Sequence, residues 1–368
     1  MAASSTVIGH ETVRGRLLTA HRDGRLGHAV LLTGPSGVGK TALACDFASA
    51  VLDASRWPGG LLAHPDLWLE DSDAERIGID RVRPGAPAET GPSLQDAMSL
   101  RTYAGGARIA VMARAERLTE QAADALLKTL EEPPPDTVIV LCAANPDALP
   151  ATILSRAQHI GVGRVGVPRI SAWLEEQGLE ARLAGLAAAL SGGRPGRAKR
   201  LATQPGALSA EIEALHSFLA VAGAGMEGAL RAATELTPGA GADGRERAML
   251  LLSVWASFVR DAMCEAEAVP EMRLWKDYAD PLKRWAESLG AARLTEILGL
   301  LMRASGDISR YAQPRLTFET LFLDIFSGPD APPPVVAPSL PLALADAPAA
   351  PATTRAPRPA TGRSAKRR

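Results

Sequence analysis

The sequence has little of what several classes of protein depend on. Aromatic residues make up 4% of its 368 residues, and the cysteines are scattered as Cys45, Cys142 and Cys264. Such scattered cysteines form neither a disulfide framework nor a zinc-binding spacing and suit a reducing compartment, so we expect a cytoplasmic protein. No apolar run reaches about 18 residues and residues 1–27 are polar, so neither a membrane span nor a signal peptide is expected.

The chain also lacks an excess of charge of either sign. It has 40 lysine and arginine residues against 41 aspartate and glutamate residues, a formal net charge of −1. Contact with nucleic acid would therefore have to be local rather than a property of the whole surface. Hydrophobic residues reach 46%, and alanine, glycine and proline are abundant. This composition favours helices packed through small side chains over an all-β fold.

Residues 1–165 alternate short apolar runs with helical patterns. The runs that predict strands are residues 28–33, 64–70, 108–112 and 137–143. Helices are expected over residues 41–52 and 119–132, the second with Thr119 as N-cap and with prolines at its end. Continuous apolar strands separated by helices are typical of a parallel sheet covered on both faces, so we predict an α/β domain here.

The strand patterns disappear from about residue 167. We predict a small helical unit and then a larger helical block with an apolar face that includes Leu251, Trp255 and Phe258. Glycine-rich residues 237–244 predict a flexible connection within that block. The end of the chain is rich in proline and alanine, so we expect a disordered tail, with a local nucleic-acid contact as the alternative. The predicted divisions are residues 1–165, 166–204, 205–327 and 328–368.

The segment GPSGVGKT, residues 34–41, fits the pattern G-x-x-x-x-G-K-[ST] between a predicted strand and a predicted helix. That context indicates a phosphate-binding loop, whose backbone N–H groups surround phosphates at a helix N-terminus. In such loops the lysine contacts the β- and γ-phosphates and the threonine ligates Mg²⁺, so we expect ATP or ADP, with Mg²⁺. A loop that binds no nucleotide is the alternative. The candidate binding residues are Gly34, Pro35, Ser36, Gly37, Val38, Gly39, Lys40 and Thr41.

The predicted strand at residues 108–112 ends where nucleotide hydrolases carry two carboxylates. One completes the magnesium site and the other orients the attacking water, but here the two positions are Ala113 and Arg114. The nearest carboxylate, Glu116, falls in the turn before the next helix. A solvated or helix-start charge is the simpler interpretation of Glu116, and rescue of hydrolysis is the other. The pattern therefore favours a nucleotide that is held without efficient turnover.

A serine–arginine pair, Ser155 and Arg156, lies shortly beyond the last predicted strand. An arginine at the rim of a domain can enter the site of a neighbouring subunit and stabilise charge on a transferring phosphoryl group. Such an arginine finger contributes about 10³–10⁵ in rate. Taken alone, Arg156 is more simply interpreted as an ordinary surface arginine.

Three segments resemble the delta-prime family of bacterial DNA polymerase III clamp-loader subunits. These segments are residues 7–44, 115–157 and 313–326. The string ALLKTLEEPP followed by SR is specific to clamp-loader ATPase domains, including those of gamma and tau subunits. The resemblance implies an AAA+ domain, a small helical lid and a helical collar that holds a pentameric ring, which agrees with the divisions above.

The resemblance also implies roles for single residues. Arg156 matches the arginine that acts in trans on a neighbouring ATPase subunit, although Ala157 stands where the family carries a cysteine. Asn145 lies near the first sensor position. At the second sensor, Gly196 takes the place of the arginine of motor subunits, and Arg197 is one residue further along.

The zinc-binding cysteine cluster common in the resembled family has no counterpart in this sequence. Residues 50–64 contain no cysteine, and a structural zinc site needs four ligands. His64 is expected to begin a strand rather than to bind a metal, and no zinc is predicted.

Together these features imply a stator subunit that binds ATP but hydrolyses it weakly or not at all. The implied partners are gamma or tau motor subunits and a delta subunit, with the sliding clamp and primed DNA reached through the complex and no membrane involved. An active motor subunit of the gamma or tau type is the alternative. A scaffold derived from the AAA+ fold, outside replication, is a third and less specific reading.

Overall fold

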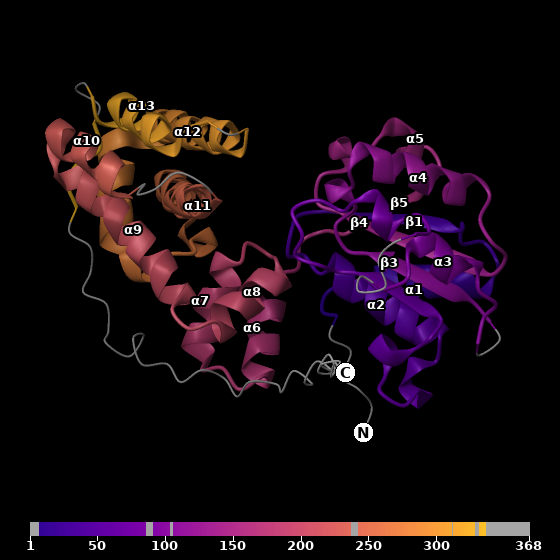
Figure 1. Cartoon of the computed structure of the whole chain (residues 1–368). Coiled ribbons are helices and arrows are strands. Elements are labelled where there is room, and N and C mark those ends of the chain that lie inside the picture. Colours follow the sequence, from indigo (N-terminus) through magenta and orange to yellow (C-terminus); the bar gives the residue numbers. More distant parts are fainter. Residues whose placement is uncertain are drawn as a thin grey trace, which may run out of the picture. The chain divides into compact units, whose positions relative to one another are not determined.

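The computed structural model of the chain describes residues 7–85, 91–103, 106–236, 242–310, 312–327 and 331–335. It consists of two compact units, Met1–Arg200 and Leu201–Arg368 (Figure 1). The first unit contains a parallel sheet covered by helices and the second is helical, so the fold class predicted from the sequence is confirmed. Within the described ranges, no helix combines the length and the apolar character needed to cross a membrane.

A five-stranded sheet forms the centre of the first unit, with the strand order β2-β3-β4-β1-β5. All of its pairings are parallel. The strands β3 and β4 have the predicted bounds, whereas β2 begins three residues later than predicted because residues 64–67 form a turn closed by a 3.1 Å hydrogen bond. The strands are β1 (Ala29–Thr33), β2 (Leu67–Glu70), β3 (Arg108–Met112), β4 (Thr137–Ala143) and β5 (Gln158–Gly161).

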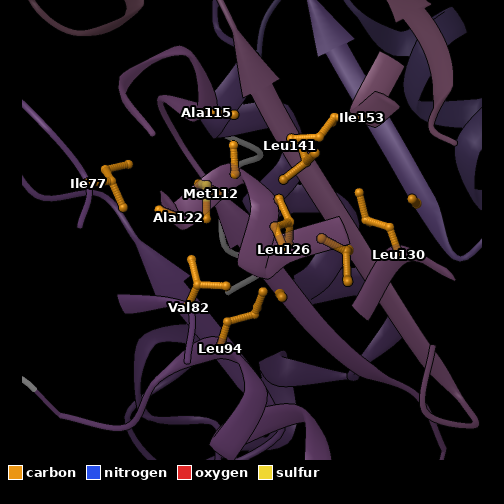
Figure 2. Packing of buried hydrophobic residues seen from close by; sticks show 14 of the residues in the cluster. Ile77, Val82, Leu94, Met112, Ala115, Ala122, Leu126, Leu130, Leu141 and Ile153 are labelled. Carbon is orange, nitrogen blue, oxygen red and sulfur yellow. The ribbon is translucent and has the colours of Figure 1, made fainter. Parts of the chain in front are cut away.

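Successive strand residues face opposite sides of the sheet, and both sides are covered. On one side Met112, Leu126 and Leu141 belong to a cluster that joins the sheet to α3, α4 and α5 (Figure 2). On the other side Leu32 and Phe47 belong to a cluster with α1 and α2. Burial on both sides explains the largely apolar runs of β1, β3 and β4. The helices are α1 (Glu11–Arg22), α2 (Lys40–Val51), α3 (Leu94–Ser99), α4 (Glu120–Glu131) and α5 (Ala151–Leu154).

The chain leaves the neighbouring strands β1 and β4 in opposite directions across the sheet, so its direction of winding reverses between them. From β2 through β3 and β4 to β5 it moves one way, over the face that carries α3, α4 and α5. From β1 to β2 it moves the other way, over the face that carries α2. Ligands of open parallel sheets bind at such a reversal, beyond the carboxyl ends of the strands. The segment that follows β1 therefore lies where a ligand is expected.

Helix α4 agrees with its prediction to within one residue at each end. The hydroxyl of Thr119 accepts a hydrogen bond from the N–H of Ala122 at 3.2 Å, so Thr119 is the N-cap. Leu126 and Leu130 are buried against the sheet. The helix therefore fixes both the turn that precedes it and the proline-rich segment that leads into β4.

Three further helices follow β5. They are α6 (Val167–Glu176), α7 (Ala181–Leu190) and α8 (Pro195–Thr203). The boundary between the two compact units falls within α8, so α6 and α7 belong to the first unit. The separation of residues 166–204 as a lid of their own stays a prediction.

The second unit is built around aromatic side chains. Phe218 and Trp255 stack with ring centroids 4.9 Å apart, and the indole N–H of Trp255 donates to the carbonyl of Ala214 at 2.7 Å. Leu251, Trp255 and Phe258 are buried, which confirms the predicted apolar face. The helices are α9 (Ala207–Gly223), α10 (Gly225–Leu236), α11 (Ala242–Ala266), α12 (Ala279–Ser309), which is broken at Gly290, and α13 (Pro314–Phe326).

Two predictions fall partly outside the described residues. Residues 237–241 of the predicted flexible connection lie outside them, and Ala242 already begins α11. Of the predicted tail, residues 331–335 are described and the remainder lies outside. Val335 is buried, and Pro334 lies 3.7 Å from the position that a Cβ on Gly223 would take. That short piece is packed rather than disordered, because its proline rings and valine supply apolar surface that overall composition does not reveal.

Candidate nucleotide-binding site

The loop after β1 follows a path that requires glycine. Gly34, Gly37 and Gly39 have φ angles of +152°, +79° and +109°, which glycine adopts without steric penalty. Gly34 also passes close to another segment, since a Cβ there would lie 2.2 Å from the carbonyl oxygen of Val162. The backbone path alone therefore accounts for the glycines of the pattern.

The side chain of Lys40 is buried and turns back onto its own loop. Its ammonium donates to the carbonyl oxygens of Gly34 at 2.7 Å and Pro35 at 3.0 Å. Burial lowers the pKa of Lys40, while the charge of Glu116 acts in the opposite direction. The positive charge needed to meet phosphates is therefore located at the loop, where carbonyl groups hold it in place.

The end of β3 carries an ion-paired arginine where a hydrolase would carry acids. Ala113 is buried, and its N–H donates to the carbonyl of Glu70 at 2.9 Å. The guanidinium of Arg114 donates to Asp73 at 2.9 Å and to Asp71 at 3.1 Å. These hydrogen bonds raise the pKa of Arg114, and the bond with Asp73 has the larger effect. Arg114 therefore neutralises acids that follow β2 and adds no metal ligand of its own.

Glu116 lies in the 3₁₀ turn Ala115–Arg117, which follows β3. The sequence predicted this turn. It also suggested that Glu116 is a solvated charge, which does not hold for its Oε2 atom. Oε2 is buried and has no hydrogen-bond partner among the described residues. A sequence pattern does not specify how the atoms of one turn are buried, so this feature could not be predicted.

The residues at this edge suit a magnesium ion bound together with phosphates. Mg²⁺ takes oxygen ligands, usually one or two carboxylates combined with phosphate oxygens and water. Thr41 lies in the first turn of α2, and Glu116 has the buried oxygen described above. Within the described ranges no group of three or more His, Cys, Asp or Glu side chains could hold a metal ion unaided. A nucleotide would therefore have to complete the site.

The start of α8 lies against the phosphate-binding loop. The N–H of Gly196 donates to the carbonyl of Gly37 at 2.8 Å, and a Cβ on Gly196 would lie 3.0 Å from that oxygen. An arginine at position 196 would therefore require the loop to shift. The backbone nitrogen of Arg197 lies 3.4 Å from the position of a Cβ on Gly37, so the structure brings this sensor candidate to the loop.

Asn145 follows β4 at the same edge of the sheet, where the parallel strands end. Its Oδ1 accepts a hydrogen bond from the N–H of Asp147 at 3.2 Å and caps the turn Pro146–Ala148. β4 pairs with β1 up to Thr33 and Ala143, immediately before the phosphate-binding loop. Asn145 is thus near the loop, and its role as a sensor stays a prediction.

Arg156 lies at the other edge of the sheet, where the parallel strands begin. It precedes β5, whose residues Gln158 to Gly161 pair in parallel with Val30 to Thr33. The length of β5, about 10 Å at roughly 3.3 Å per residue, therefore separates its backbone from the loop after β1. Its side chain is 36% exposed, and its guanidinium pairs with Glu131 at 2.7 Å and donates to the carbonyl of Thr152 at 3.0 Å. The sheet keeps Arg156 apart from the phosphate-binding loop of its own chain.

His10 also contacts the loop, although it belongs to no recognisable sequence motif. It lies immediately before α1 and is buried, with Nε2 2.9 Å from the carbonyl oxygen of Val38. The same ring nitrogen lies 3.6 Å from the position that a Cβ on Gly39 would take. An isolated histidine carries no pattern, so only the fold reveals that it supports the loop.

Comparison with known proteins finds a family match and similar proteins. Residues 9–165 match the family described as DNA polymerase III, delta subunit. DNA polymerase III subunit delta' of Pseudomonas aeruginosa is 36% identical over 195 residues, which cover 47% of this chain and 55% of that protein. The delta' subunit of Escherichia coli is 29% identical over 201 residues, covering 50% of this chain and 58% of that protein.

Subunits of a second kind match this chain as well. DNA polymerase III subunit tau/gamma of Haemophilus influenzae is 32% identical over 171 residues, covering 45% of this chain and 24% of that protein. A solved gamma subunit-related protein of Thermotoga maritima is 20% identical, covers 84% of this chain and 97% of its own, and has a TM-score of 0.38. The chain spans about half the length of the delta' relatives it matches. Residues 9–165 thus match the DNA polymerase III, delta subunit family, and the chain is similar to both delta' and tau/gamma subunits of DNA polymerase III.

Proposed function

We propose that the chain is the stator subunit of a clamp loader, a delta-prime subunit that binds ATP or ADP with Mg²⁺ and does not hydrolyse ATP efficiently. The observation that carries this proposal is the ion-paired Arg114 at the end of β3, next to Ala113. Efficient hydrolysis needs a metal-binding acid and a group that orients water. Neither side chain can do this work, whereas the loop at residues 34–41 retains the parts that bind phosphates.

The second part of the proposal assigns an arginine finger in trans to Arg156. Its position at the edge where the parallel strands begin supports this role, because the phosphate-binding loop lies at the edge where they end. The exposed guanidinium is paired with Glu131, and an exposed ion pair of this kind contributes little energy that a partner would have to overcome. A neighbouring subunit's nucleotide could therefore take over the guanidinium.

The proposed partners follow from the relatives, which are named delta' and tau/gamma subunits of DNA polymerase III. The chain would assemble in the cytoplasm with gamma or tau motor subunits and a delta subunit. Through that complex it would help to load the sliding clamp onto primed DNA. In this assembly the first unit would carry the AAA+ domain and lid, and residues 205–327 would form the collar.

An active motor subunit of the gamma or tau type is a second candidate. Two observations favour it: the match to tau/gamma relatives and the buried, unpartnered oxygen of Glu116 at the edge beside the loop. Against it, the position that would orient water carries Arg114, which is held by Asp71 and Asp73.

The rate of ATP hydrolysis by the purified full chain distinguishes the two candidates. The stator proposal predicts no turnover above background, together with binding of ATP or ADP that Lys40→Ala abolishes. Lys283→Ala, at an exposed lysine of the second unit, is the matched control and should bind as the wild type does. Turnover of several ATP per minute that disappears in Lys40→Ala would show a motor subunit and contradict the proposal.

A further inference from the structure

One carboxylate oxygen of Glu116 is buried without a hydrogen-bond partner among the described residues. The residue lies beyond the carboxyl end of β3, and only β4 separates β3 from β1. Oε2 is buried and accepts no hydrogen bond from any described residue. A buried carboxylate oxygen without a partner is unfavourable, so a cation bound at this point would be strongly stabilised.

The carboxylate lies within electrostatic reach of the phosphate-binding lysine. The charge of Glu116 opposes the lowering of the Lys40 pKa that burial causes. The ammonium of Lys40, however, donates to the carbonyl oxygens of Gly34 and Pro35 and makes no hydrogen bond to Glu116. Glu116 is thus near the place where β- and γ-phosphates would meet Lys40, and its Oε2 remains available to a ligand.

The two acids that follow β2 are already ion-paired. Asp71 and Asp73 follow β2, and both accept hydrogen bonds from Arg114. Using either as a metal ligand would break an ion pair and leave a positive guanidinium beside the metal. Since Mg²⁺ bound to a nucleotide needs only one or two carboxylates from the protein, Glu116 is sufficient for such a site.

We infer that Glu116 is a ligand of the Mg²⁺ that accompanies a nucleotide on the loop at residues 34–41. Glu116 would then bind the metal in place of the acid that is missing at position 113. No residue would replace the water-orienting acid that is missing at position 114. The inference rests on the proposed nucleotide binding and deepens it. It assigns this chain a magnesium-dependent retention of nucleotide that is separate from turnover.

The test is the affinity of the full chain for ADP, measured by isothermal titration calorimetry with Mg²⁺ and again with EDTA. Residues that merely orient a metal ligand change metal affinity by about 10–100-fold, so Glu116→Gln should lose at least about tenfold of the tightening that Mg²⁺ gives. Its affinity in EDTA should stay the same or rise, because a negative charge near the phosphates is gone. Glu120→Gln, an exposed carboxylate in the first turn of α4, should behave as the wild type.

Glu116→Asp keeps the charge on a shorter side chain and should retain part of the tightening that Mg²⁺ gives. This variant also provides a test if Glu116→Gln fails to fold. Full magnesium dependence in Glu116→Gln overturns the inference. An equal change with Mg²⁺ and with EDTA overturns it too, since the carboxylate then only balances Lys40. Magnesium-independent binding by the wild type contradicts the inference alone, whereas no ADP or ATP binding in either condition contradicts the proposed nucleotide binding as well.

Discussion

Replacing Arg156 by alanine is expected to slow ATP hydrolysis at the neighbouring motor subunit by about 10³-fold, the lower end of the contribution of an arginine finger. The side chain is partly exposed and lies at the edge of the sheet away from its own phosphate-binding loop. Its guanidinium pairs with Glu131 and donates to the carbonyl of Thr152 and the hydroxyl of Ser155. Single-turnover hydrolysis by a complex reconstituted with a gamma- or tau-type subunit, sliding clamp and primed DNA measures this effect.

Two controls separate the charge of Arg156 from its packing. Glu131→Gln removes the partner of the ion pair and keeps the guanidinium, so it should leave turnover near the wild-type rate. Arg56→Ala removes an exposed arginine that pairs with Asp53 elsewhere on the first unit, and it should also have no effect. Unchanged turnover in Arg156→Ala, in a complex that assembles normally, would show that the role in trans is wrong.

Trp255→Ala is expected to lower the free energy of unfolding of the second unit by about 3–5 kcal/mol, the usual cost of truncating a buried aromatic residue. The indole is fully buried, stacks on Phe218 at 4.9 Å and contacts Phe318 edge-on with ring centroids 5.2 Å apart. Its N–H also donates to the carbonyl of Ala214, so the variant loses both packing and this hydrogen bond, while Ser217 still donates to the same carbonyl.

Hydrogen exchange measures this loss for each unit of the full chain separately. Amides of α9 and α11 should exchange faster in Trp255→Ala, while those of β3 and β4 in the first unit keep their protection. Met302→Ala, at a side chain that is 65% exposed on α12, is the matched control and should change little. Unaltered protection of α9 would contradict the central place given to Trp255 in this core.

The parts of the fold that the sequence predicts are those with a periodic or capped pattern. β3 and β4 are buried along their whole length and apolar after their first residues, and α4 has both an N-cap at Thr119 and prolines beyond its end, so their bounds agree closely. β5 was missed because Ile160 is its only large apolar residue and the strand lies at the edge of the sheet. Edge strands bury little surface, so their sequences carry little of the signal that marks a buried strand.

The contacts that define the site could not be predicted, because they join residues far apart in the chain. The pairing of Arg114 with Asp71 and Asp73 depends on the adjacency of β2 and β3. The same adjacency buries an ion pair between Arg108 and Asp66, with 2.9 Å between the charged groups. The orphaned oxygen of Glu116 depends on how one turn packs. Sequence identified the loss of the acids at positions 113 and 114, and the fold identifies what their replacements do.

We propose that the tasks of a nucleotide site are divided between two edges of one sheet. The edge where the strands end keeps the phosphate-binding loop, with Lys40 in place and Glu116 beside it, but Arg114 stands where water would be oriented. The edge where the strands begin carries Arg156. In the arrangement we propose, the chain would bind a nucleotide for itself and contribute to hydrolysis at the site of a neighbour.

The most direct test of this division compares Lys40→Ala with Arg156→Ala in the DNA-stimulated ATP turnover of the same reconstituted complex. The account predicts that Lys40→Ala leaves turnover close to the wild-type rate, because this chain's own loop hydrolyses little ATP, and that Arg156→Ala lowers it strongly. A loss of turnover in Lys40→Ala that equals or exceeds the loss in Arg156→Ala, with assembly intact in both, would contradict the account.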